Sequence, residues 1–167
     1  MKINVTVSNE WNSLCSEYQQ LLETHQTTYP VQLGAIAKAL GIKILSSTLR
    51  SDISGEIRET NGEVTIKVNR HDAKTRQRFT VAHELAHYFL HRDLLKDGIV
   101  DDVLYRSSHS TYIEQEANRL AADILMPIHL LNALVLQCNH EKETSRKIEY
   151  LAQELNVSIT ALKIRLG

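Results

Sequence analysis

The residues best suited to chemistry lie in the stretch FTVAHELAHYFLH, from Phe79 to His91, where an apolar sequence carries three histidines and a glutamate. Within it, His83, Glu84 and His87 follow the pattern HExxH. Because four residues advance a helix by ~400°, the two imidazoles would stand one turn apart on one side, where both can reach one metal ion at ~2.0–2.1 Å. Glu84 would project beside that ion, placed to accept a proton from a metal-bound water whose pKa zinc lowers to about 7.

Short patterns such as HExxH also arise by chance, so the surroundings of the motif matter. Apolar residues lie on every side of the expected helix and predict that it is largely buried: Phe79, Val81, Leu85, Tyr88, Phe89 and Leu90. Buried imidazoles and carboxylates are costly without partners, and a metal ion supplies one. His91 lies one turn further, but the three histidines drift by ~80° over two turns, so we expect His91 at the helix end or beside a ligand.

A tetrahedral metal site needs a further protein ligand, and one candidate is Asp93. It lies where the longer pattern HExxHxxGxxH would place a third histidine. The glycine that bends the chain in that pattern is replaced here by Leu90, so the turn toward the metal is hard to make.

The better candidate lies in a later helical stretch, YIEQEANRLAADILMP. Its apolar stripe centres on Ala117 and includes Ile113, Leu120, Ala121 and Ile124. Glu114 lies ~60° from that centre, whereas Glu116 lies ~100° away on the other flank, next to Asp123. We therefore favour Glu114 as the ligand and expect Glu116 and Asp123 on the solvated side. The alternative role for Glu114 is a capping box with Thr111.

The rest of the chain must supply elements that position these residues. Helical periodicity predicts helices over about 10–25, 30–41, 72–92, 111–127, 128–137 and 143–155, and a short last helix with Ser158 as its N-cap. The stretch IKIL predicts a short strand, and SGEIRETNGEVTIKVN predicts a β-hairpin with Asn61-Gly62 in a type I′ turn. The Gly, Asp and Ser content of residues 92–110 indicates a loop.

Composition is that of a soluble globular protein, with 43% hydrophobic residues, 23% charged residues and a net charge of -1. With the helices and strands expected above, we predict one α+β domain spanning residues 1–167. No signal peptide and no run of the ~20 apolar residues that a membrane span needs is present, so we expect a cytoplasmic protein without membrane contact. Cys15 and Cys138 lie far apart and outside metal-binding spacings, which predicts buried free thiols. The oligomeric state is not readable from the sequence.

Two motifs together, QRFTVAHELAHYFLH and EQEANRLAADILMP, resemble the ImmA/IrrE family of metallopeptidases. The hairpin is similar to that family's sheet, and the likeness runs from about Pro30 to Met126, with a weaker match beyond. The resemblance implies a small zincin-like fold of the gluzincin type, with a short antiparallel sheet and the HExxH helix packed among several helices. Ala86 departs from the glycine that many members have there; both residues are small.

Carried onto this sequence, the resemblance makes His83, His87 and Glu114 the Zn²⁺ ligands and Glu84 the general base. Asn118 matches the position that orients a zinc-binding histidine through a hydrogen bond. Family members are intracellular endopeptidases, or regulators of that shape, whose usual partner is a helix-turn-helix repressor inactivated by cleavage. The expected function is thus a site-specific zinc metalloendopeptidase in a phage, mobile-element or stress-response switch. We expect the hairpin ending at Asn69 to hold an extended substrate.

The C-terminal part, about 128–167, carries KIEYLAQELNVSITALKIRL, which resembles a helix-turn-helix. A regulator that binds DNA or a partner, and holds a metal without turnover, is therefore the alternative function. The second helix offers only Thr160, Lys163 and Arg165 as polar contacts. Because half or more of the contacts to DNA are to phosphates, we expect packing or partner docking rather than direct nucleic-acid binding. Tyr105, His109 and Tyr112 lie near the motifs, but the sequence does not choose an oxyanion donor among them.

Overall fold

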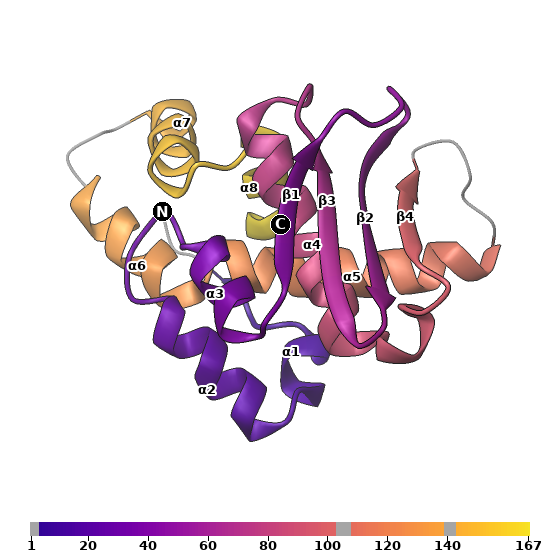
Figure 1. The fold of residues 1–167 in the computed structure, drawn as a ribbon. Coiled ribbons are helices and arrows are strands. Elements are labelled where there is room, and N and C mark those ends of the chain that lie inside the picture. Colours follow the sequence, from indigo (N-terminus) through magenta and orange to yellow (C-terminus); the bar gives the residue numbers. More distant parts are fainter. Residues whose placement is uncertain (1–3, 103–107, 139–142) are drawn as a thin grey trace.

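The computed structural model describes residues 4–102, 108–138 and 143–167. The strands are β1 (Lys43–Ser47), β2 (Ile53–Thr60), β3 (Glu63–Asn69) and β4 (Ile99–Asp102). The helices are α1 (Asn9–Ser13), α2 (Ser16–His25), α3 (Leu33–Ala39), α4 (Lys74–Leu90), α5 (Ser108–Leu125), α6 (Ile128–Gln137), α7 (Thr144–Leu155) and α8 (Ile159–Leu166), with a 3-10 turn, η1, over Arg92–Leu94. The chain therefore has the predicted α+β fold, with several helices around one small sheet (Figure 1).

The strands form one mixed sheet in the order β1-β3-β2-β4 (Figure 1). β2 and β3 make the predicted antiparallel hairpin, and its turn has Asn61 at φ 52° and Gly62 at φ 79°, the positive values that a type I′ turn requires. β1 pairs in parallel with β3, because the chain reverses twice before β3 returns alongside β1. The sheet is therefore mixed, whereas the resemblance implied an antiparallel sheet.

β4 is the element that the sequence pattern does not predict. It lies within the expected loop over residues 92–110 and pairs antiparallel with β2, with Gly55 opposite Asp101. Among the described residues, β1 and β4 are the edges of the sheet, and both strands of the hairpin lie inside it. The prediction that the hairpin ending at Asn69 serves as an edge platform for a substrate is therefore wrong, because its strands are already paired on both sides.

α4 lies between the sheet and α5, behind the strands in Figure 1. It contacts β2 and β3 on one side, α5 on another, and also α3. Its residues are buried without interruption from Thr80 to His87, as the all-round apolar pattern predicts. The HExxH motif thus lies in the buried stretch of α4.

The N-terminal helical region differs from the single helix expected over about 10–25. Leu14 is extended at the end of α1, with ψ 142°, so the chain turns before α2 begins at Ser16. This break lets α1 pack against α5 while α2 packs against α3. Cys15 lies in the break and is exposed, which corrects the expectation of a buried thiol; Cys138 is buried as expected.

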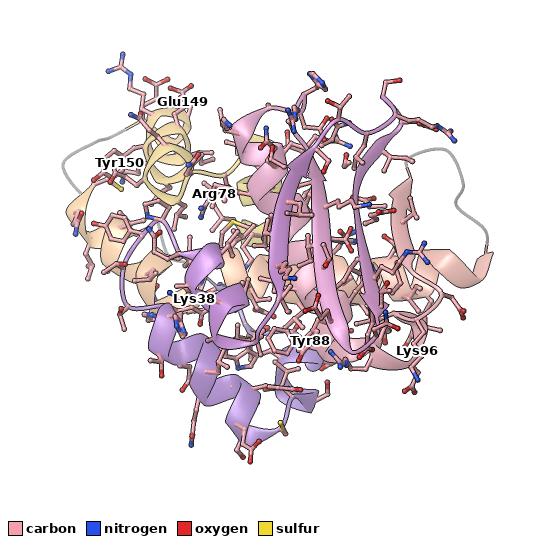
Figure 2. The ribbon with its side chains drawn as sticks, in the orientation of Figure 1. Lys38, Arg78, Tyr88, Lys96, Glu149 and Tyr150 are labelled. Carbon is pink, nitrogen blue, oxygen red and sulfur yellow. The ribbon has the colours of Figure 1, made fainter. Side chains whose placement is uncertain are left out.

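The C-terminal helices share the main core. Leu131 of α6, Leu151 of α7 and Leu162 of α8 are fully buried in the same hydrophobic cluster as the α4 and α5 residues. The guanidinium of Arg78 on α4 donates to the backbone carbonyl of Asn156 in the α7–α8 turn, at 3.2 Å (Figure 2). Ser158 caps α8 as predicted, accepting from the backbone N–H of Ala161 at 3.0 Å.

Arg165 and Asp123 tie the last helix to α5. The Nη2 atom of Arg165 lies 2.6 Å from Oδ1 of Asp123, and both side chains are almost completely buried, at 7% and 1% exposed. The Ser8 N–H donates to the other oxygen of Asp123. Asp123 is therefore buried and ion-paired, not on the solvated side as its helical angle suggested, and Arg165 is not available to contact DNA.

Within the described ranges, no single helix is long and apolar enough to cross a membrane. The stretch Tyr112–Leu125 together with α6 reaches that length and hydropathy, but the two halves are bent by 48°.

Candidate metal centre

His83 and His87 bring their Nε2 atoms to one point inside the molecule. The two side chains lie one turn apart on α4, and their Nε2 atoms are 3.0 Å from each other. Both residues are buried, at 2% and 0% exposed. Two imidazole lone pairs that meet in an apolar interior repel each other unless a proton or a cation lies between them.

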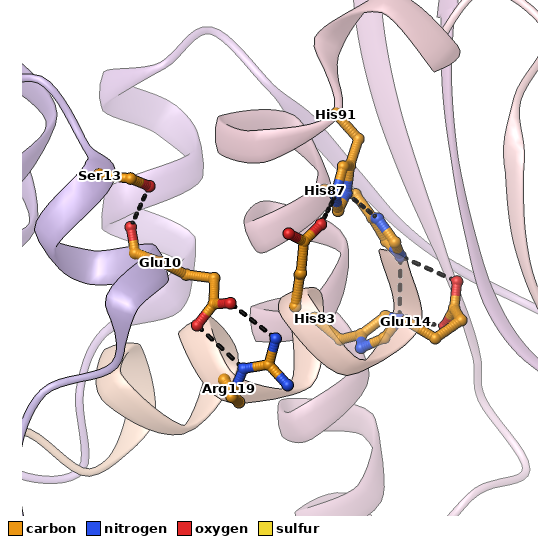
Figure 3. A network of polar contacts seen from close by, with 8 residues as sticks. Glu10, Ser13, His83, His87, His91, Glu114 and Arg119 are labelled. Atoms are coloured by element: carbon orange, nitrogen blue, oxygen red, sulfur yellow. Dashed lines mark hydrogen bonds and ion pairs between the residues drawn. The ribbon is translucent and has the colours of Figure 1, made fainter. Parts of the chain in front are cut away.

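Glu114 of α5 closes this cluster from the opposite side (Figure 3). Its Oε2 lies 2.9 Å from Nε2 of His83, and its Oε1 lies 3.2 Å from Nε2 of His87. Donor atoms around a tetrahedral zinc are ~3.3 Å apart, since each is ~2.0–2.1 Å from the ion. The separations of 2.9, 3.0 and 3.2 Å among these three groups are close to that value. Among the described residues, His83, His87 and Glu114 form the one group with the spacing of a metal site.

Glu84 lies beside the three ligand candidates in full burial. Its side chain is 0% exposed, and neither carboxylate oxygen has a hydrogen-bond partner in the protein. A buried carboxylate without a donor is costly, so its retention here calls for a partner that the protein itself does not provide. A hydrolytic metal centre supplies such a partner in the water it activates, so the donor set and the orphaned carboxylate together fit a catalytic zinc ion.

The backbone of β2 comes close to Glu84 at Gly55. A Cβ atom on Gly55 would lie 2.4 Å from Cγ2 of Thr80 and 3.3 Å from Oε1 of Glu84. Glycine therefore permits the sheet and α4 to approach at the level of the motif, and this approach encloses the Glu84 carboxylate.

Asn118 of α5 orients His83. Its Oδ1 lies 2.9 Å from Nδ1 of His83, so the imidazole donates there and leaves Nε2 free to bind a metal. Asn118 is one turn after Glu114, so a single face of α5 supplies both a candidate metal ligand and the group that orients His83. The structure thus gives Asn118 the contact that the family resemblance implied.

His87 is oriented in a different way, through His91 (Figure 3) and, beyond it, through Glu116. Nδ1 of His87 lies 2.8 Å from Nδ1 of His91, and Nε2 of His91 lies 2.9 Å from Oε2 of Glu116. His91 ends α4, as predicted for a histidine beyond the ligand pair. The expectation that Glu116 faces solvent is wrong, because its side chain is only 22% exposed and binds His91. Sequence reasoning found His91 but did not connect it to Glu116.

The charges of the cluster depend on one another. Burial disfavours a charged His83, but the Glu114 hydrogen bond and the nearby Glu84 and Asp101 carboxylates outweigh it and raise the pKa of His83 to about 9. Burial lowers the pKa of His87 to about 4, opposed only in part by Glu114. Burial would raise the pKa of Glu114, but its hydrogen bonds with both histidines lower it to about 2. A proton on His83 thus occupies the place that a cation would take between these groups.

Burial raises the pKa of Glu84 well above its usual value, and the carboxylates of Asp101, Glu114 and Glu56 add to this effect, whereas His83 opposes it. A carboxyl group with a raised pKa is a stronger base when ionised, and its burial beside the ligands suits proton transfer.

The positions of the other candidate residues bear on the ligand, cap and oxyanion alternatives that the sequence left open. Asp93 is exposed in η1 and lies outside the cluster. α5 begins at Ser108, so Thr111 is inside the helix and is not its N-cap, which removes the capping-box role for Glu114. Tyr112 is 63% exposed. Tyr105 lies outside the described residues, and so does the side chain of His109.

Comparison with known proteins agrees with this geometry. The model of the family Peptidase_M78, described as the IrrE N-terminal-like domain, matches residues 37–167. Among curated proteins, no sequence matches the chain. Among solved structures, a Mycobacterium tuberculosis transcriptional regulator is similar in fold, with a TM-score of 0.61 and 14% sequence identity. The likeness covers 93% of this chain and 46% of that one, so this chain spans less than half the length of the regulator.

Proposed function

Since this chain belongs to the IrrE N-terminal-like domain family, a metallopeptidase family, we propose that it is a cytoplasmic zinc endopeptidase that cleaves one cognate helix-turn-helix repressor. One observation carries the proposal. The Nε2 atoms of His83 and His87 and the carboxylate of Glu114 converge within 2.9–3.2 Å of one another, beside the buried and unpartnered carboxylate of Glu84. Three ligands with an adjacent base are the parts that metal-assisted peptide hydrolysis requires.

In this mechanism His83, His87 and Glu114 would hold the metal, and Glu84 would act as the general base. A bound zinc ion supplies Lewis acidity and lowers the pKa of water to about 7. The Glu84 carboxylate accepts a proton from the attacking water and passes it to the leaving amine. Its burial beside β2 keeps bulk water away and fixes its direction. Asn118 holds the His83 ring so that Nε2 faces the ligands.

The substrate platform in this proposal is β4, not the hairpin. An extended peptide adds to a sheet only at a free edge, and β4 is the edge strand paired with β2 beside Glu84. Asp101 of β4 lies close enough to influence the charge of both His83 and Glu84. A linker beside the DNA-binding region of a repressor could lie there, because a flexible linker becomes extended without unfolding a core.

The second candidate is a regulator that holds a metal and binds a partner without cutting it. It is favoured by the similar solved structure, which is described as a transcriptional regulator and is more than twice as long as the part that this chain matches. Direct DNA binding by α8 has less support, because Arg165 is buried in its ion pair with Asp123 and only Lys163 remains as an exposed cation of that helix.

The substitution Glu84→Gln separates these two candidates. It keeps the shape of the side chain but removes the base, so we expect zinc to remain bound while cleavage falls by at least ~10²–10⁴-fold. The matched control is Glu149→Gln on the exposed surface of α7, which should cleave as the wild type does (Figure 2). If Glu84→Gln complements a deletion strain fully, the protein acts by binding and the peptidase proposal is wrong.

Metal content tests the ligand assignment. We expect one zinc per chain in the wild type, none in His83→Ala or His87→Ala, and a strong loss in Glu114→Ala. Asp93→Ala should retain zinc, because Asp93 is exposed and outside the cluster. Inductively coupled plasma mass spectrometry on the purified variants measures this. A zinc content that falls in Asp93→Ala but not in Glu114→Ala would contradict the assignment.

The substrate is tested by co-expressing the protein with the product of the neighbouring gene, which this proposal expects to be a helix-turn-helix repressor, followed by intact-mass analysis. We expect two repressor fragments, cut within or beside the DNA-binding region, with the wild-type protein and intact repressor with Glu84→Gln. Casein should remain uncut, since general proteolysis in a cell would be harmful. An intact repressor under inducing conditions, or rapid digestion of casein, would refute this substrate.

A further inference from the structure

We propose that His91 and Glu116 act as a positioning pair that fixes the tautomer and the ring orientation of the metal ligand His87. This inference rests on the metal site proposed above and concerns residues that do not themselves touch the metal. Nδ1 of His91 lies 2.8 Å from Nδ1 of His87 within α4 and its C-cap, and Nε2 of His91 lies 2.9 Å from Oε2 of Glu116, which joins the end of α4 to α5.

The direction of these hydrogen bonds follows from the chemistry of imidazole. To bind a metal through Nε2, a neutral His87 must carry its proton on Nδ1. Nδ1 of His87 then donates to Nδ1 of His91, which must be an unprotonated acceptor. A neutral His91 therefore carries its proton on Nε2 and donates it to the Glu116 carboxylate, which only accepts. One consistent set of donors and acceptors connects the three residues.

Glu116 is the group that makes this set unique. If a donor occupied its place, Nε2 of His91 would have to accept, and the proton would move to Nδ1 of His91. The two Nδ1 atoms, 2.8 Å apart, would then both be protonated, or His87 would carry its own proton on Nε2, where the metal must bind. The carboxylate excludes both arrangements. It also raises the basicity of His87 through the chain of hydrogen bonds, as outer carboxylates do for zinc-binding histidines.

Burial makes these contacts energetically significant. The His91 side chain is 8% exposed and that of Glu116 is 22% exposed, so water competes little for the hydrogen bond between them. His83 is oriented differently, by the neutral amide of Asn118 at 2.9 Å. His83 and His87 are thus oriented by different residues of α5. We expect loss of the Asn118 contact to affect His83 and loss of the Glu116 contact to affect His87.

Zinc affinity, measured by competition with a chromophoric chelator, tests the pair without relying on activity. His91→Phe keeps a ring but removes both hydrogen bonds, and Glu116→Ala removes the final acceptor. We expect each to weaken zinc binding by about 10–100-fold, the usual effect of losing an outer partner of a metal ligand. His71→Phe and Glu149→Gln, at exposed positions away from the cluster, are the matched controls and should bind zinc as the wild type does.

Conservative variants distinguish positioning from general structural support. Glu116→Gln retains an amide oxygen that can accept from His91, and His91→Gln retains one acceptor and one donor. Both should recover most of the zinc affinity that Glu116→Ala and His91→Phe lose. Because the two residues act on His87 in series, the double variant His91→Phe/Glu116→Ala should bind zinc about as weakly as His91→Phe alone, not by the product of the two losses. Urea unfolding of the metal-free variants identifies any that fail to fold.

The inference is overturned if folded His91→Phe and Glu116→Ala bind zinc within two- to three-fold of the wild type, or if their losses multiply in the double variant. It is also overturned if His91→Gln and Glu116→Gln are both as weak as His91→Phe and Glu116→Ala, because accepting and donating groups at these two positions would then be irrelevant. These results leave the metal site itself intact. Failure of the proposed function has a separate signature, which is a wild-type protein that does not bind zinc at all.

Discussion

Replacing Gly55 with alanine tests whether the close approach of β2 to α4 builds the site. A Cβ atom at this position would lie 2.4 Å from Cγ2 of Thr80 and 2.9 Å from the backbone oxygen of Lys67. Carbon atoms in proteins pack at ~3.5–4.0 Å, so Thr80 would have to move by about 1 Å or more. Thr80 has little room to rotate away, since its side chain is only 2% exposed and is packed on every side.

The cost of this contact can be estimated from its surroundings. Inserting one carbon into a packed core destabilises proteins by ~1–3 kcal/mol. We expect Gly55→Ala near the upper end of that range, because one of the two close atoms belongs to the backbone of β3 and cannot rotate. Zinc affinity should fall as well, since the displaced part of α4 lies one turn before Glu84.

Urea unfolding of the metal-free protein measures the stability change, and two further variants make it specific. Gly34→Ala is the matched control, because nothing lies within 4 Å of a Cβ at Gly34 in α3. Alanine in a helix is favoured over glycine by ~0.5–1 kcal/mol, so this variant should be as stable as the wild type or more so. Thr80→Ser removes Cγ2 and should restore part of the stability when combined with Gly55→Ala.

The partial rescue is itself a prediction, since the contact with the Lys67 oxygen remains in the double variant. A Gly55→Ala protein with wild-type stability and zinc affinity would refute the argument that glycine is needed for the close approach. If the double variant loses more stability than the two single variants lose together, Thr80 is not the neighbour that the new Cβ atom displaces.

Two further predictions concern the side chains that join distant helices. Arg119 donates two hydrogen bonds to Glu10, at 2.7 and 3.0 Å, and thereby lowers the pKa of Glu10 from its usual 4.5. Because its folded-state pKa is lowered, the ionised Glu10 stabilises the protein above about pH 4.5, and this stabilisation is lost as the pH falls further. We therefore expect wild type to be more stable than Glu10→Gln by roughly 1 kcal/mol at pH 7 in urea unfolding, and this difference should shrink toward pH 3. Arg165→Ala leaves the buried Asp123 carboxylate without its cation and should cost ~3–5 kcal/mol in urea unfolding, whereas Lys163→Ala on the exposed face of α8 should change stability little.

Elements specified by local pattern could be predicted from the sequence. The hairpin follows from alternation and from Asn61-Gly62, because those two residues adopt positive φ more readily than others. α4 and α5 follow from long helical periodicity, and the bounds of α6 were predicted to the residue. The juxtaposition of His83 and His87 follows in turn, because a four-residue spacing on a helix fixes the relation of the two imidazoles before any tertiary contact forms.

Elements specified by tertiary contact could not be predicted. β4 has four residues, of which Ile99 is buried and Val100 is exposed, so it shows too little alternation to be distinguished from a loop. It is a strand because β2 offers it an edge. The break at Leu14 likewise exists because α1 packs against α5, and no glycine or proline marks it in the sequence.

The two glutamates of α5 show where reasoning from helical angle reaches its limit. The angle from the apolar stripe correctly aims Glu114 toward the ligand histidines, because the core-facing side of α5 also faces α4. The same angle assigns Glu116 and Asp123 to solvent, yet both find partners, His91 and Arg165, supplied by other helices. A helical wheel describes one helix, whereas burial of a flank depends on what packs against that flank. His91 reaches Glu116 only because the end of α4 crosses α5 at this level, so the support of His87 is a property of the helix pair and not of either motif.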